Sequence, residues 1–143
     1  MAIEEIGEKK WEKEISSMNS KADLVLRVNT LKTTKKNLIE KLYNQNIYCE
    51  EIPNRPNALK VIKRVNIFKT IEFKLGFFEL QDASSQLVAE FLDVNTKHKI
   101  LDACAGAGGK ALHIASILNN KGNIVATDIH EFKLLELKKR ARR

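Results

Sequence analysis

Cysteine is scarce in this sequence of 143 residues, and the scarcity limits the kinds of site that it can hold. The two cysteines, Cys49 and Cys104, form no CxxC pair, and two thiols are too few for a disulfide framework or a structural zinc site. The three histidines share no ligand spacing with an acid or a cysteine, so we expect no metal site. Both cysteines are expected to be reduced thiols.

Long apolar segments are also missing. No apolar run reaches the roughly 18 residues that a transmembrane helix needs, so we expect no membrane span. The first ten residues alternate acids and lysines and contain no apolar signal core, and we therefore expect a cytoplasmic protein. The hydrophobic fraction of 43% is nevertheless ordinary for a packed soluble protein.

Positive charge, by contrast, is abundant and unevenly spread. The net charge is +7, with −2 over residues 1–20, +5 over 21–128 and +4 over 129–143. A basic balance favours polyanionic partners, above all nucleic acid. Charge alone is weak evidence, since many soluble proteins are basic.

The first part of the chain, residues 1–72, is predicted to be a small α+β unit. After a polar helix over 1–20, the pattern predicts strands over 24–28, 47–52 and 58–62, with a helix from Thr33 or Thr34 to Asn44 between the first two. Basic side chains occur throughout this unit. They are consistent with an RNA-binding-like subdomain and equally with a solvated surface, because we can place no stacking aromatics here.

The second part, residues 73–143, has the rhythm of a βαβ unit. A strand over 76–80 and a helix that begins at Asp82 or Ser84 come first. Strands over 100–104 and 123–128 then alternate with helices over 109–118 and 131–143. This alternation predicts an α/β fold with a parallel sheet.

A glycine-rich loop between the first of these two strands and its helix is the strongest functional signal. Glycines let the backbone approach a ligand closely, and free amides at a helix start favour a carboxylate or a phosphate. Asp128, at the end of the next strand, follows Gly106 by 22 residues, a position that suits a carboxylate holding both ribose hydroxyls. The alternative is a purely structural role, in which the glycines form a tight turn beside a buried acid at the end of a strand.

Three kinds of nucleotide-like ligand use loops of this type. Gly106, Gly108 and Ala111 formally fit the dinucleotide pattern G-x-G-x-x-G/A, although Lys110 argues against it. A Walker loop fails, because it needs glycine at Cys104 and serine or threonine at Ala111. S-adenosylmethionine fits, since it offers a ribose to Asp128 and a free carboxylate to the loop and Lys110.

Two nearby side chains invite a catalytic role that we do not assign. Cys104 lies where helix-start amides lower a thiol pKa, but no base is identifiable beside it. We therefore expect Cys104 to contribute its backbone to the cofactor loop and not to act as a nucleophile. His113 can approach the cofactor from the following helix, and we expect it instead at the surface.

Three motifs in order resemble the Nop/Sun family of RNA (cytosine-C5) methyltransferases. Residues 102–110 read DACAGAGGK, similar to the family's CAAPGGK core except that Gly106 and Ala107 replace Ala-Pro. Residues 76–86 read GFFELQDASSQ, like the segment before the family's methyltransferase core, and residues 26–32 read LRVNTLK, like the opening of its RNA-binding subdomain. The resemblance implies an N-terminal α+β RNA-binding-like subdomain and the first βαβ part of a class I, Rossmann-like methyltransferase sheet.

The function that the resemblance implies is methylation of cytosine C5 in RNA, expected to be bacterial rRNA, with S-adenosyl-L-methionine as cofactor. It assigns the cofactor contacts to eight residues: Cys104, Ala105, Gly106, Ala107, Gly108, Gly109, Lys110 and Asp128. Residues 81 and 82 and the basic sheet are expected to help hold RNA. The family's two catalytic cysteines lie on later strands, so they are expected beyond Arg143, and residues 73–143 are expected to be a truncated methyltransferase domain.

We therefore predict that these 143 residues alone do not methylate RNA. A tritium-transfer assay from labelled S-adenosylmethionine to RNA is expected to show no turnover. Turnover by this chain would contradict the prediction. Two alternatives stay open at this point: an RNA-binding fragment without catalysis and a fragment of a nicotinamide oxidoreductase.

Overall fold

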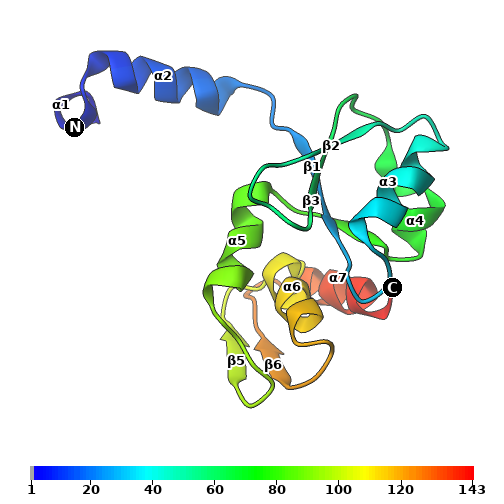
Figure 1. The fold of residues 1–143 in the computed structure, drawn as a ribbon. Helices are drawn as coiled ribbons and strands as arrows, with labels where there is room; N and C mark the ends of the chain where they lie inside the picture. The colour runs from blue at the N-terminus through cyan, green and yellow to red at the C-terminus, as the bar shows by residue number, and fades with distance from the viewer. Residues whose placement is uncertain (1) are drawn as a thin grey trace.

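The computed structural model describes residues 2–143 and shows two small sheets joined by helices. In Figure 1, α5 and α6 lie between a four-stranded sheet and a pair of parallel strands, while α1 and α2 project away from both. The elements are α1 (Ala2–Ile6), α2 (Glu8–Asn19), β1 (Leu24–Val28), α3 (Lys35–Tyr43), β2 (Cys49–Glu51), β3 (Ala58–Val61), η1 (Ile67–Lys69), α4 (Ile71–Lys74), β4 (Phe78–Leu80), α5 (Ala83–Phe91), β5 (Lys99–Asp102), α6 (Gly109–Ile117), β6 (Asn123–Ala126) and α7 (Glu131–Arg142).

The polar helix expected over residues 1–20 is two helices. Gly7, with a φ of 80°, interrupts it and forms the N-cap of α2. Neither α1 nor α2 has a buried residue, because both lie outside the packed body. Met1 lies outside the described residues. None of the helices within residues 2–143 is long and apolar enough to cross a bilayer.

The first sheet has the strand order β2-β3-β1-β4, and all its pairs are antiparallel. Leu26, in the central strand β1, is opposite Leu59 of β3 on one side and Leu80 of β4 on the other. The strand expected over 76–80 thus belongs to this sheet and does not begin the next one. The boundary predicted between residues 72 and 73 stays a prediction.

Helix α3 covers this sheet and closes its core. The Thr34 side chain accepts a hydrogen bond from the Asn37 amide at the start of α3, which satisfies one of the free N–H groups there. Leu38 and Leu42, one turn apart, are completely buried. They pack with Leu26, Phe78 and other apolar residues from all parts of the unit, which makes one contiguous core.

The second sheet is the expected parallel pair. Strands β5 and β6 pair from Lys99 opposite Asn123 to Asp102 opposite Ala126. Ile114 and Leu118 of the α6 region pack with Ala89 of α5 over one face, while Leu101 and Val125 are exposed on alternate positions. The predicted α/β organisation, an α+β unit followed by a parallel βαβ unit, is confirmed.

The buried core of the first unit gives a stability prediction. Leu38→Ala removes a completely buried side chain and leaves a cavity, so the free energy of unfolding is expected to fall by about 3 kcal/mol. Leu135→Ala, in the exposed part of α7, is the matched control and is expected to change it by less than about 0.5 kcal/mol. Urea unfolding followed by circular dichroism measures both. Equal effects of the two substitutions would contradict the packing described here.

Candidate functional site

The loop between β5 and α6 folds around two glycines with positive φ. Gly106 has a φ of 54° and Gly108, the N-cap of α6, has a φ of 85°. A Cβ on Gly108 would lie 2.5 Å from the Cγ of Leu137, so the close approach of α7 requires glycine there. A Cβ on Gly106 would meet nothing within 4 Å, so the space in front of Gly106 is open.

Asp128 reaches the loop from the end of β6, as the spacing predicted. Its Oδ2 accepts a hydrogen bond of 2.9 Å from the Gly106 amide, and its Oδ1 accepts one of 2.9 Å from the His130 amide. The His130 amide, the Gly106 amide and the nearby Lys133 ammonium hold the pKa of the Asp128 carboxyl below its usual value. Asp128 is therefore a fixed carboxylate at neutral pH.

The loop opens on one side into a cavity of about 260 Å³. Four residues of the predicted site line it, namely Cys104, Ala105, Gly109 and Lys110. The other four, Gly106, Ala107, Gly108 and Asp128, are not among its lining residues, and Gly106 and Asp128 meet beside it. The structure thus divides the predicted site into a cavity part and a strand-tip part.

Four further residues complete the cavity: Gln81, Asp82, Ser85 and Asp102. Asp82 also caps α5 by accepting hydrogen bonds from the Ser84 and Ser85 amides. Gln81 Oε1 and Asp102 Oδ2 are buried and have no hydrogen-bond partner among the described residues. Two buried acceptors without a donor favour a ligand that donates hydrogen bonds.

Sequence reasoning missed these lining residues for different reasons. Asp102 directly precedes the glycine loop and was visible as a second acid at a strand tip. Gln81 and Ser85 lie more than 15 residues before the loop, and no local pattern connects them with it. Residues 81 and 82, expected beside RNA, line the cavity next to the glycine loop.

The two cysteines have different surroundings. Burial raises the pKa of the Cys49 thiol to about 11, so it is a protonated thiol at neutral pH. Cys104 is an exposed free thiol on the loop. Among residues 2–143 no group of three or more histidine, cysteine and acidic side chains is placed to hold a metal ion.

His113 lies in the interior, and the expected surface position is wrong. Only 2% of it is exposed, because α6 turns this side chain toward the four-stranded sheet. There Arg27 of β1 donates a hydrogen bond of 3.4 Å to Ser116 Oγ of α6. Burial, and secondly the charge of Arg27, lower the pKa of His113 to about 4, so it is neutral at pH 7.

Comparison with known protein families gives two matches that together cover most of the chain. Residues 2–68 match the ferredoxin-like domain of RsmF/B-like methyltransferases, and residues 89–143 match the 16S rRNA methyltransferase RsmB/F. The ferredoxin-like match contains β1, β2 and β3 of the antiparallel sheet but not β4, and the second match contains β5, α6, β6 and α7.

Curated relatives and a solved structure agree with these matches. The chain is 37% identical over 118 residues to the probable ribosomal RNA small subunit methyltransferase B of Bacillus subtilis (strain 168), covering 82% of this chain and 26% of the relative. It is 32% identical over 133 residues to ribosomal RNA small subunit methyltransferase B of Proteus mirabilis (strain HI4320), covering 93% and 31%. A methyltransferase homolog protein from Pyrococcus horikoshii superposes with a TM-score of 0.86 at 27% identity, covering 96% and 45%. The chain thus spans about a quarter to a third of the length of these curated relatives.

The buried His113 makes stability depend on pH. Its pKa is about 4 in the folded chain and near 6.5 when unfolded, so between these values the unfolded chain binds the extra proton. Stability is therefore expected to fall as the pH drops from 6.5 to 4, by about 2 to 3 kcal/mol from this group.

Urea unfolding at several pH values tests this dependence in the parent chain and in His113→Gln. The variant is expected to lose less stability on acidification, whereas His98→Gln, a change in an exposed histidine, is expected to follow the parent. Identical pH profiles for all three would contradict the buried, neutral state of His113.

Proposed function

The chain belongs to the Nop/Sun family of methyltransferases, to which RsmB and RsmF belong. From this premise we propose that it forms the S-adenosylmethionine site and part of the RNA-binding surface of an RNA (cytosine-C5) methyltransferase. The proposed substrate is rRNA. The observation that carries the proposal is the contact between the Gly106 amide and the Asp128 carboxylate. It brings the cofactor loop and the ribose-binding acid together at the ends of two parallel strands.

Asp128 is suited to hold the two ribose hydroxyls of the cofactor. A carboxylate offers about four acceptor positions, and the amides of Gly106 and His130 use one on each oxygen. One position on each oxygen is left for a hydroxyl donor. The lowered pKa of Asp128 keeps the group in the accepting, ionised form.

The cavity is suited to hold the amino-acid end of the cofactor. The free amides at the start of α6 and the ammonium of Lys110 favour its carboxylate. The unpartnered oxygens of Gln81 and Asp102 favour its ammonium group, which is a donor. We propose Cys104, Ala105, Gly106, Ala107, Gly108, Gly109, Lys110 and Asp128 as cofactor-binding residues, with Gln81 and Asp102 added to them.

The bound cofactor supplies the methyl group on a sulfonium, and this chain's residues hold and orient it. We do not assign the role of a catalytic cysteine to either cysteine of the chain. Cys49 is a protonated thiol in the first sheet, far from the loop in sequence. Cys104 is an exposed thiol, and within residues 2–143 no basic side chain donates a hydrogen bond to it. Their proposed roles are core packing for Cys49 and a backbone contribution to the loop for Cys104.

The four-stranded sheet supplies features that suit RNA. Tyr43, at the end of α3, and Tyr48, before β2, form an edge-to-face pair with ring centroids 5.5 Å apart. They are 61% and 48% exposed, so their faces are available to stack on unpaired bases. The exposed Lys63 and Arg64 follow β3 in the same unit. This pair is the aromatic element that could not be placed from the sequence.

Titration calorimetry with S-adenosylhomocysteine tests the cofactor site. The chain is expected to bind it, and Asp128→Asn is expected to weaken binding about 10- to 100-fold, because a charged acceptor of two hydrogen bonds is lost. Asp23→Asn, an exposed acid paired with Lys60 on the other sheet, is the control and is expected to bind like the parent.

The other functions give different results in the same experiment. RNA binding without any heat from S-adenosylhomocysteine would favour the fragment that only binds RNA. Binding of NAD in preference to S-adenosylhomocysteine would favour an oxidoreductase fragment and would overturn the proposal.

A further inference from the structure

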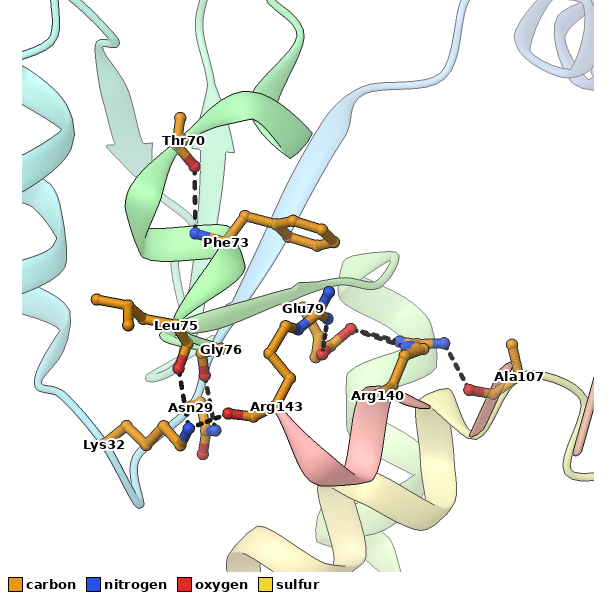
Figure 2. Close-up of polar contacts among 10 residues, drawn as sticks. All are labelled: Asn29, Lys32, Thr70, Phe73, Leu75, Gly76, Glu79, Ala107, Arg140 and Arg143. Atoms are coloured by element: carbon orange, nitrogen blue, oxygen red, sulfur yellow. Dashed lines mark hydrogen bonds and ion pairs between the residues drawn. The ribbon is translucent and has the colours of Figure 1, made fainter. Parts of the chain in front are cut away.

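Arg140 of α7 connects the four-stranded sheet with the glycine loop. Its Nε and one terminal nitrogen donate hydrogen bonds of 2.9 and 2.7 Å to Oε2 of Glu79 in β4. Its other terminal nitrogen donates a hydrogen bond of 2.7 Å to the carbonyl oxygen of Ala107. Figure 2 shows the guanidinium between these two partners.

The bridge is largely shielded from water. The side chains of Arg140 and Glu79 are 15% and 10% exposed, so solvent screens their contact much less than it screens a surface ion pair. A guanidinium is planar and presents its donors in a fixed fork. Once Glu79 holds one edge of this fork, the direction of the donor that faces Ala107 is fixed as well.

Neutralising the charge of Glu79 is not the particular role of Arg140, because other cationic groups lie around this carboxylate. Glu79 also accepts a hydrogen bond from Arg143 at Oε1, and Arg27 lies near enough to interact with it electrostatically. Three guanidinium groups therefore surround one carboxylate. Glu79 keeps a cationic partner without Arg140, whereas Arg140 is the one hydrogen-bond donor to the Ala107 carbonyl within residues 2–143.

Helix α7 also supports the loop from a second position. Leu137, one turn before Arg140, packs where a Cβ of Gly108 would lie. The Gly108 amide in turn donates a hydrogen bond of 2.8 Å to the Ala105 carbonyl, which closes the turn around Gly106 and Ala107. The Ala107 carbonyl and the Gly108 amide belong to the same planar peptide, so holding this carbonyl also holds the amide that closes the turn. The turn begins at Ala105 and contains Gly106, whose own amide contacts Asp128.

We propose that Arg140 is a positioning residue for the cofactor loop, and that Glu79 of the four-stranded sheet orients it. The proposal rests on the proposed function for its consequence in cofactor binding, but its effect on the loop is independent of any ligand. Arg140 contacts no ligand-binding side chain in this arrangement. It acts through the backbone of residues 105–108.

The test compares Arg140→Lys with Arg142→Lys, an exposed arginine two residues further along the same helix. Lysine keeps the charge but has a single nitrogen, which cannot bridge Glu79 and Ala107 in the same way. Three properties of the 143-residue chain are measured: amide chemical shifts of Gly106 and Gly108 without ligand, affinity for S-adenosylhomocysteine, and the thermal unfolding midpoint.

Arg140→Lys is expected to shift both glycine amides and to weaken S-adenosylhomocysteine binding about 5- to 10-fold at temperatures where the chain is fully folded. Arg142→Lys is expected to leave both unchanged. If Arg140→Lys does not fold, Arg140→Gln gives a second test, since it leaves Glu79 paired with Arg143 but has no guanidinium to bridge Glu79 and Ala107. The same changes in direction are expected.

Each other outcome decides one of the two proposals. A lower unfolding midpoint with unchanged glycine shifts and unchanged affinity would show a structural role only and would overturn the inference. Shifted amides with unchanged affinity would also overturn it, because the loop would tolerate the displacement. If the parent chain binds no S-adenosylhomocysteine while Arg140→Lys shifts the amides, the cofactor assignment fails and the positioning of the loop stands.

Discussion

The assembly of the two sheets depends on the ion pairs that the Glu79 carboxylate forms with Arg140 and Arg143. Charged groups buried at a junction are costly unless they are paired, and here one acid compensates guanidinium groups from β1 and from α7. Burial still lowers the pKa of Arg27 to about 10, which shows that the pairing only partly offsets its removal from water. Removing Glu79 would leave several positive charges together in a region with little solvent.

This constraint reaches the candidate site through helix α7. Arg140 and Leu137 contact the glycine loop at Ala107 and Gly108, and neither of them lines the cavity. Gly108 is required by that packing and by its positive φ, while Gly106 leaves room in front of the loop. Helix α7 therefore holds Ala107 and Gly108, while Cys104, Ala105, Gly109 and Lys110 line the cavity.

Much of this arrangement could be predicted from local patterns. The strands and helices of the βαβ unit, the capping roles of Thr34 and Asp82 and the pairing of Asp128 with the loop all follow from residue types at short spacings. Two predictions were wrong: the helix over 1–20 divides at Gly7, and His113 is buried. The strand after Gly76 pairs with β1 of the first sheet. A hydrophobic period identifies a strand but does not name its partner, and a lone histidine on a helix carries no signal of what covers it.

The sequence by itself determined the glycine loop and the acid that meets it, because a βαβ unit returns the chain to the same edge of a parallel sheet after one crossover. Only the tertiary structure decided that Gln81 and Asp102 share a cavity with the loop, and that Glu79 and Arg140 hold the loop in place. These contacts join residues separated by up to 61 positions, and they depend on how two independently patterned units pack. No local spacing encodes that packing, because it is set by the shapes and charges that both units bring to their junction.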